Sequence, residues 1–102
     1  MSLKQVTALR KSGEITAALE LARWDYSIFV DHFSASALFW TLRVICENKI
    51  QQGAQEEAAT ILEEMQDVFK DIDDNEGIAQ RCLDRLIIQI DPESVRIFKA
   101  YS

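Results

Sequence analysis

Apolar residues recur at the spacing of an α-helix along most of this chain. Leu3, Val6 and Leu9 lie three residues apart, and Gly13 follows them, where glycine can adopt the left-handed conformation that ends a helix. Beyond Gly13, apolar residues at intervals of three and four predict a helix that runs to about Phe29. The apolar face of this helix consists of Ile15, Ala18, Leu19, Ala22, Tyr26 and Phe29.

Two further helices are predicted, one on each side of Gly53. The segment 31–36 is polar and small enough for a turn, and Ser34 or Ser36 can accept hydrogen bonds from the free amides at the start of the next helix. That helix is apolar over more than half of its circumference, which is typical of a central helix. The helix after Gly53 has acidic residues on one face, and its apolar face consists of Ala58, Ile61, Leu62, Met65, Phe69 and Ile72.

An acidic segment then interrupts the helical pattern. Asp73, Asp74 or Asn75 can cap a helix over 78–90, which ends at Asp91 and Pro92. With Asp91 as N-cap and Pro92 in the first turn, we expect a short final helix. Its apolar positions are Val95, Phe98 and Tyr101. Because the chain ends while its pattern is still apolar, it is also consistent with a fragment of a longer protein.

Composition supports an all-helical fold. A chain of 102 residues fits a single domain, here 1–102, and three glycines and one proline are too few for a turn-rich β-sandwich or barrel. With 48% hydrophobic and 27% charged residues, the chain has enough apolar material for a core. We therefore predict an all-α fold of five or six antiparallel helices, arranged as stacked helical hairpins or as an irregular bundle.

The chain contains an internal repeat whose register the sequence leaves open. Adding 43 to the residue numbers of the apolar face in the helix over 15–29 places all six positions on the apolar face of the helix after Gly53. The glycines give the shorter offset from Gly13 to Gly53, and each glycine is followed five positions later by an alanine, Ala18 or Ala58. The two offsets differ by close to one helical turn. The pattern therefore predicts repeated hairpins without fixing their offset.

The segment 9–22, LRKSGEITAALELA, resembles the turn and second helix of a tetratricopeptide-type hairpin. In that family a glycine closes the first helix and a small alanine lets the second helix pack closely. The segment 53–62 is similar to a weaker copy. The repeat is about 40 residues instead of the usual 34 or so, and it lacks the family's aromatic residue in the first helix and its closing proline. The resemblance, over roughly 6–65, implies a divergent TPR-like or HEAT-like array, right-handed in its stacking.

Charge and cysteine content restrict the partners and the compartment. A formal charge of −6 and a pI near 4.7 disfavour nucleic acids and anionic membranes. No apolar run approaches the roughly 18 residues of a membrane span, and residues 1–10 lack the apolar core of a secretory signal. Cys46 and Cys82, without a CxxC motif, are expected to be buried thiols, with a disulfide between them as the alternative. We expect a cytoplasmic protein.

Three features bear on catalysis or metal binding. The segment 71–77 has alternating carboxylates like a calcium loop, but Glu76 replaces the required glycine and Cys82 the bidentate glutamate. His32, the single histidine, lies in a predicted turn without a nucleophile elbow. Paired glutamates on the acidic helix face lack the histidines of a di-metal bundle. We therefore expect no enzyme, no catalytic residue, no cofactor and no metal.

The remaining features favour a non-catalytic interaction or scaffold domain that binds a peptide or helix on a surface of helical hairpins. The candidate contact residues are Arg10, Arg23, Trp24, Tyr26 and Arg43. Trp24 lies off the apolar face of its helix, so it is either an exposed anchor or packed against a neighbouring helix, whereas Trp40 is expected in the core. An apolar surplus in the central or final helix also allows a homodimer.

The alternative function is that of a small acidic inhibitor of the immunity or antitoxin type, which covers a basic active site with the acidic stretch 56–76. The residues of that acidic patch are Glu56, Glu57, Glu63, Glu64 and Asp67.

Overall fold

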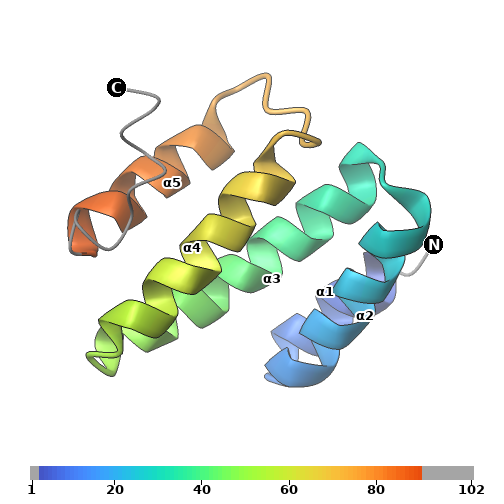
Figure 1. Ribbon diagram of the computed structural model, residues 1–102. Coiled ribbons are helices and arrows are strands. Elements are labelled where there is room, and N and C mark those ends of the chain that lie inside the picture. Colours follow the sequence, from blue (N-terminus) through green and yellow to red (C-terminus); the bar gives the residue numbers. More distant parts are fainter. Residues whose placement is uncertain (1–2, 91–102) are drawn as a thin grey trace.

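A computed structural model describes residues 3–90, which form five α-helices and no β-strand (Figure 1). The predicted all-α fold is confirmed for this part of the chain. The helices are α1 (Leu3–Lys11), α2 (Ile15–Phe29), α3 (His32–Gln51), α4 (Gln55–Phe69) and α5 (Ile78–Gln89). The expected final helix with Val95, Phe98 and Tyr101 lies outside the described residues.

The turns α1–α2 and α3–α4 have the same backbone structure. Gly13, with φ of +89°, donates its amide to the Arg10 carbonyl, and the next amide donates to the Leu9 carbonyl. This pair of hydrogen bonds is the Schellman motif, which satisfies the last carbonyls of a helix. Both bonds recur at Gly53, where φ is +78°. The two hairpins are therefore closed by the same device, at the offset that separates the two glycines.

Burial supports the same offset. The shift that moves Gly13 onto Gly53 also moves the three buried residues of α2 onto buried residues of α4, so that Ala18, Ala22 and Asp25 correspond to Ala58, Leu62 and Met65. In contrast, the offset of 43 pairs the exposed Phe29 with the half-buried Ile72. The fold thus repeats its hairpin at the glycine offset, and the additional agreement at the longer offset reflects helical periodicity.

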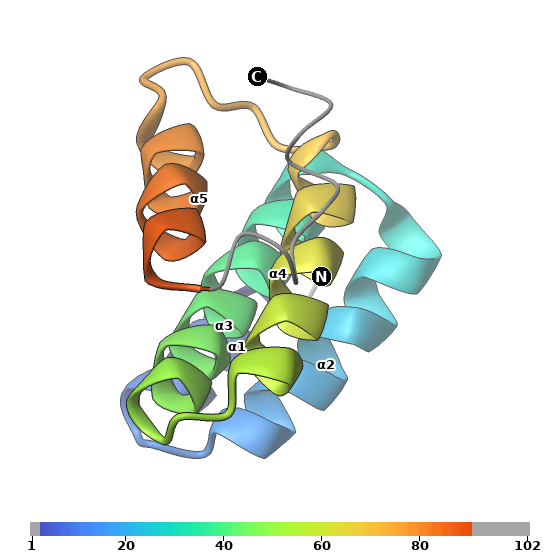
Figure 2. The same ribbon diagram turned by 60° about the vertical axis from the view of Figure 1, so that its left-hand side comes forward.

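α3 lies at the centre of the fold, as its broad apolar surface predicts. It packs most extensively against α4 and then against α2, and its buried residues include Leu38, Phe39, Leu42 and Cys46. Trp40, expected in the core, is half-buried at the edge of the core, and its ring lies edge-on to Phe39 with 4.9 Å between ring centroids. α5 lies on the opposite side of the α3–α4 pair from α1 and α2 (Figure 2).

The predicted turn over 31–36 is wrong beyond its first residue, because α3 already begins at His32. Asp31 is the N-cap, and its side chain accepts a 2.8 Å hydrogen bond from the Ser34 amide. The Asp31 amide in turn donates to the Ser34 hydroxyl at 3.2 Å, which completes a capping box. Ser34 therefore takes part in the cap as the third residue of the helix, not as the N-cap itself. The hydrogen bond from the Ser34 amide is the largest of the effects that lower the pKa of Asp31.

Asp74, which the sequence offered as a possible cap, binds the first turn of α5. The Asp74 carboxylate accepts hydrogen bonds from the Ala79 amide at 2.9 Å and the Gln80 amide at 3.0 Å. α5 then packs against α4 through a few buried residues, among them Leu83 and Leu86. Beside this narrow attachment to α4, one side of α5 faces α3 across a groove.

Candidate functional site

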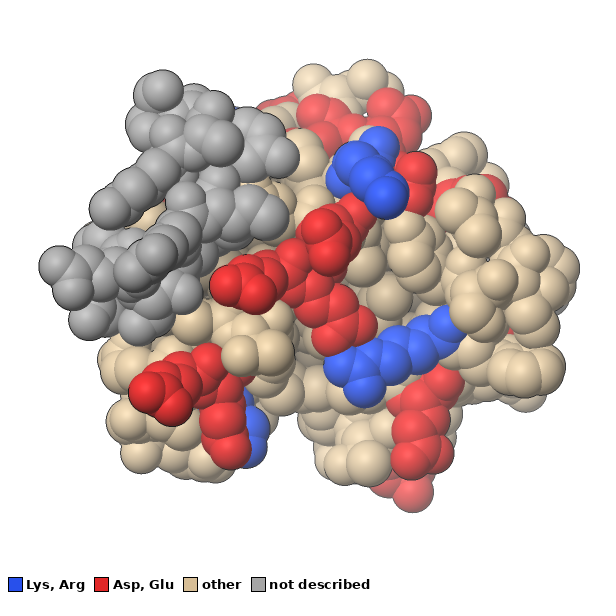
Figure 3. All heavy atoms as spheres, viewed as in Figure 1, with Lys and Arg blue, Asp and Glu red and all other residues tan. Residues whose placement is uncertain are grey.

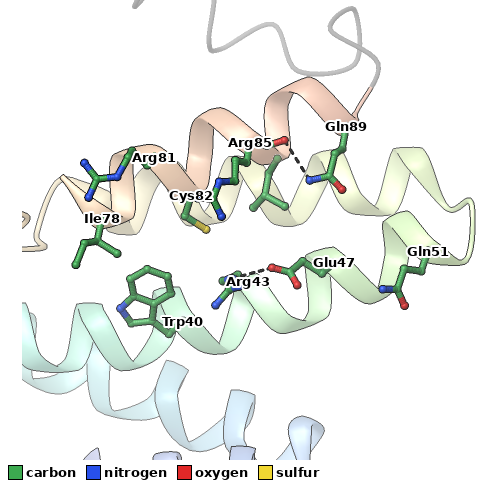
Figure 4. Close-up of a pocket in the computed structure, with 10 residues that line it drawn as sticks. Trp40, Arg43, Glu47, Gln51, Ile78, Arg81, Cys82, Arg85 and Gln89 are labelled. Carbon is green, nitrogen blue, oxygen red and sulfur yellow. Dashed lines mark hydrogen bonds and ion pairs between the residues drawn. The ribbon is translucent and has the colours of Figure 1, made fainter.

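The groove between α3 and α5 has a volume of about 530 Å³. The two helices run in the same direction along it, so Trp40 and Ile78 lie at one end and Gln51 and Gln89 at the other (Figure 4). Its lining residues are Trp40, Arg43, Glu47 and Gln51 from α3, and Ile78, Arg81, Cys82, Arg85, Leu86 and Gln89 from α5. We call it the α3–α5 groove.

Positive charge dominates the middle of the α3–α5 groove. Arg43 donates from Nε to Glu47 at 2.7 Å, and its guanidinium carbon lies 5.8 Å from the centroid of the Trp40 ring. Arg85 points from α5 into the groove, whereas Arg81 lies near the start of α5 (Figure 4). Within residues 3–90 neither Arg81 nor Arg85 has a carboxylate partner, and Glu47 is the one acid among three arginines in the lining.

Arg10 of α1 is not in the lining of the groove, but it is near enough to Arg43 for the two charges to interact. Its Nη1 atom is buried and has no hydrogen-bond partner among the described residues. Burial lowers the pKa of Arg10, and the nearby charge of Arg43 lowers it further. Two of the predicted contact residues, Arg10 and Arg43, are thus brought together, although they belong to different helices, α1 and α3.

The two cysteines are free thiols, and the prediction that they are buried is confirmed for Cys46 but is wrong for Cys82. Cys46 is buried and donates to the Ala58 carbonyl at 3.6 Å, while Cys82 is half-buried in the lining of the groove. Burial raises the pKa of Cys46 to about 12 and also raises the pKa of Cys82. Both thiols are protonated at neutral pH, so neither is activated as a nucleophile.

A second surface consists of exposed apolar residues at the end of α2 and the start of α3. We call it the α2-end patch, and its residues are Trp24, Ile28, Phe29, Val30 and Phe33. The sequence left open whether Trp24 is exposed or packed against a neighbouring helix. In the structure it is 63% exposed. Val30 adopts the left-handed conformation with φ of 33°, which is strained for a β-branched residue.

Two other predicted contact residues form bonds between helices. Arg23 donates to both carboxylate oxygens of Glu64, at 3.0 and 2.6 Å, and so connects α2 to α4. The Tyr26 hydroxyl donates to the Asp71 carboxylate just beyond α4. Their polar groups therefore have partners inside the protein, while Trp24 remains available on the surface.

The predicted acidic patch lies on α4, and its carboxylates follow that helix across the face in Figure 3. Two of its five members have cationic partners, because Glu64 pairs with Arg23 and Glu57 pairs with Lys49 at 3.0 Å. The other three, Glu56, Glu63 and Asp67, have no ion-pair partner within the described part of the chain. In the same view, the side formed by α2 and the α2–α3 turn carries few charged residues.

Sequence reasoning missed Arg81 and Arg85 in the groove, and Ile28, Val30 and Phe33 in the α2-end patch. Arg81 and Arg85 are four residues apart, which places them on one side of a helix, but the sequence does not show that this side faces α3. His32, the single histidine, is exposed in the first turn of α3, and its ring centroid lies 4.0 Å from that of Phe33.

Comparison with known proteins gives no relative: no family model, no curated protein and no solved structure matches the chain. Across residues 3–90, no group of three or more histidine, cysteine or acidic side chains is placed to hold a metal ion. The helices described here are all too short or too polar to cross a membrane. The features that bear on function are therefore the α3–α5 groove, the α2-end patch and the acidic patch of α4.

Proposed function

We propose that the protein is a non-catalytic interaction domain, or scaffold, that binds the apolar face of a partner peptide or helix on the α2-end patch. The observation that carries this proposal is the exposure of five large apolar side chains within the ten-residue segment 24–33, where α2 ends and α3 begins. Contiguous apolar surface of this kind on a soluble domain marks interaction sites. Trp24 has the properties of an anchor, because tryptophan is enriched among the residues that dominate binding energy.

Backbone strain supports the same surface. A left-handed valine costs free energy, and such residues cluster at functional sites. Val30 turns the chain sharply between α2 and α3, so that Phe29 and Phe33 are both presented to solvent. The repeated hairpins are consistent with a divergent TPR-like or HEAT-like scaffold, and the two free thiols are consistent with a reducing compartment such as the cytoplasm.

Selection from a displayed peptide library tests the proposal before any partner has been identified. Peptides enriched on the wild-type protein are expected to bind the double variant Trp24→Ser/Phe33→Ser at least about 10-fold more weakly, because aromatic anchors carry much of the binding energy. Ile88→Ser is the matched control, because Ile88 is 82% exposed and lies on α5, away from the patch. Failure to enrich any peptide, or equal binding to the double variant and the control, would contradict the proposal.

The acidic inhibitor remains the second candidate, supported by the three carboxylates of α4 that lack cationic partners among residues 3–90. Under this alternative the same selection enriches basic peptides. Their affinity is expected to fall steeply by about 0.5 M salt, where charges are screened within a few ångströms, and to be lost in Glu63→Gln/Asp67→Asn. Peptides bound to the α2-end patch are expected to lose little affinity in the same titration.

A further inference from the structure

We propose that the α3–α5 groove binds an extended acidic peptide segment, in which an apolar residue is followed within one or two positions by aspartate or glutamate. This inference rests on the proposed function, because it also treats the protein as a peptide-binding domain. It assigns a second surface and a different class of ligand. It follows from the order of side chains along the groove.

The first zone of the groove is apolar. Trp40 and Ile78 face each other at this end (Figure 4), and Ile78 is 48% exposed although its side chain is large and apolar. A short apolar side chain of a ligand would cover Ile78 and the edge of the Trp40 ring, and would remove both from water. The apolar residue of the peptide would therefore lie at this end of the groove, beside Trp40 and Ile78.

The middle zone is cationic. Arg43 and Arg85 approach from opposite walls, whereas Arg81 lies one helical turn before Arg85 and its guanidinium extends toward the start of α5 (Figure 4). With three arginines and one glutamate, the lining has an excess of two positive charges in a chain whose formal charge is −6. Arg43 uses its Nε for Glu47, which leaves its two terminal nitrogens to donate to a ligand. Guanidinium groups form paired hydrogen bonds with carboxylates, so the zone fits aspartate or glutamate side chains.

The last zone consists of amides. Gln51 and Gln89 lie on the two walls at the far end, and Gln89 donates from Nε2 to the Arg85 carbonyl at 3.3 Å, which leaves its side-chain oxygen to accept. Side-chain amides both donate and accept, as a peptide backbone does, so they suit the main chain of a ligand. The cationic and amide groups are spread along the groove, whereas the polar groups of a small-molecule site converge on one ligand.

The length of the groove matches a short peptide. Trp40 and Gln51 lie about three helical turns apart on α3. At a rise of about 1.5 Å per residue this separation is about 16 Å, which an extended chain spans with about five residues. The distance from Trp40 to Arg43 is about one turn, which corresponds to one or two residues of an extended ligand.

The test uses fluorescence anisotropy with three labelled peptides of about six residues. The first contains leucine followed by aspartate and two glutamates, the second has asparagine and glutamine in place of the acids, and the third has serine in place of the leucine. We expect the first peptide to bind, and the second and third to bind at least about 10-fold and a few-fold more weakly, respectively. Equal binding of the first two peptides would overturn the proposal, as would no binding of the first.

Matched variants locate the site. Arg85→Gln is expected to weaken binding of the acidic peptide at least about 10-fold, whereas Arg23→Gln, which removes the same charge from α2, is expected to leave it within about twofold. Circular dichroism of each variant establishes that it is folded. Equal loss in the two variants would mean attraction by net charge alone, and a phosphoserine peptide that binds when the acidic peptide does not would replace the ligand class with phosphopeptides. Both results would overturn the proposal.

The double variant Trp24→Ser/Phe33→Ser separates this inference from the proposed function. It removes the α2-end patch, so it is expected to bind the acidic peptide as the wild type does. If library peptides fail to depend on Trp24 while the acidic peptide depends on Arg85, the groove assignment holds and the patch assignment fails. The opposite result retains the patch and rejects the groove.

Discussion

At the scale of single residues, the most unusual conformation belongs to Val30. Among residues 3–90 it is the one residue other than glycine with positive φ. Its side chain is 57% exposed and buries little apolar area in compensation. The strain is therefore a cost to stability that the fold carries at the surface that we propose for binding.

The first prediction concerns this strain. Val30→Gly is expected to raise the free energy of unfolding by about 1 kcal/mol, because a left-handed residue with Cβ costs about 1–2 kcal/mol and glycine loses part of that gain through its flexible unfolded state. Urea denaturation measures the change. Val30→Ala is the control, since it retains Cβ and is expected to gain less. A glycine variant less stable than the wild type would show that Val30 contributes packing that outweighs its strain.

The second prediction concerns Tyr26. Burial raises its pKa to about 12, with the hydrogen bond to Asp71 and then the charges of Asp71 and Asp67 adding to the effect. In the unfolded chain the phenol ionises near its ordinary pKa of 10.0. Because the folded-state pKa is the higher one, the stabilisation by Tyr26 is fully present below pH 10 and is lost as the pH rises through about 12.

Ultraviolet difference absorbance of tyrosinate measures this titration. The wild type is expected to show a transition near pH 12 that is absent from Tyr26→Phe. The variant is also expected to be less stable at pH 7 by about 1 kcal/mol, the usual net contribution of a hydrogen bond. Asp71→Asn, which keeps an acceptor but removes the charge, is expected to lower the pKa of Tyr26. If Tyr26 of the wild type titrates near pH 10, the result would contradict its hydrogen bond to Asp71.

At the scale of helices and turns, the repeat determines which glycines are equivalent. A Cβ atom at Gly13 or at Gly53 would have no other atom within 4 Å, so an alanine at either position meets no steric obstacle. Its cost comes from the positive φ alone, which is +89° at Gly13 and +78° at Gly53. The two turns should therefore respond to the same substitution in the same way.

The third prediction follows from this equivalence. Gly13→Ala and Gly53→Ala are each expected to lower the free energy of unfolding by about 1 kcal/mol. The double variant is expected to lower it by about the sum, because the two turns have separate hydrogen-bond partners and neither added Cβ contacts a neighbouring side chain. Denaturant unfolding of the three variants checks this. Costs that differ by more than about 1 kcal/mol would mean that the two hairpins, although alike in backbone, are not equivalent in stability.

The same scale shows what the sequence was able to predict. Helical periodicity placed α2 and α5 nearly to the residue, because each has one apolar face. The apolar face predicted for the helix after Gly53 extended to Ile72, about one turn beyond the end of α4 at Phe69. The predicted start of α3 was wrong because Asp31 and Ser34 act together as a capping box. Taken singly, each residue is equally typical of a turn or of a simple N-cap. The groove was not predictable, because it depends on how α5 lies beside α3, and their facing residues are separated by an entire helix and loop.

At the scale of the whole molecule, charge is distributed unevenly. Carboxylates follow α4, and the end formed by the α2-end patch is largely uncharged (Figure 3). Three arginines line the α3–α5 groove. The net charge of −6 therefore describes neither binding surface. Net charge alone disfavours an acidic partner, whereas the groove that we propose as a binding site has an excess of positive charge. The location of each charge is therefore more informative about a partner than the net charge is.

The fourth prediction concerns the oligomeric state. The sequence assigned an apolar surplus to the central or final helix, of which the final one lies outside the described residues. In the central helix α3, Phe39 and Leu42 are fully buried and Trp40 is half-buried. Among the described residues, five of the seven large apolar side chains that are exposed belong to the α2-end patch. Five partly exposed side chains offer less than the roughly 800 Å² per partner of a standard interface, and two copies of charge −6 repel each other. We therefore expect an 11.7 kDa monomer.

Light scattering with size exclusion over a range of protein concentrations measures the mass, and Trp24→Ser serves as the comparison. A constant monomer mass in both proteins leaves the α2-end patch open for a partner. A dimer that forms with increasing concentration in the wild type, but not in Trp24→Ser, would contradict the prediction and would mean that the patch binds a second copy of the chain. High salt distinguishes these cases further, because screening weakens the repulsion between like chains and promotes a dimer held by apolar contacts.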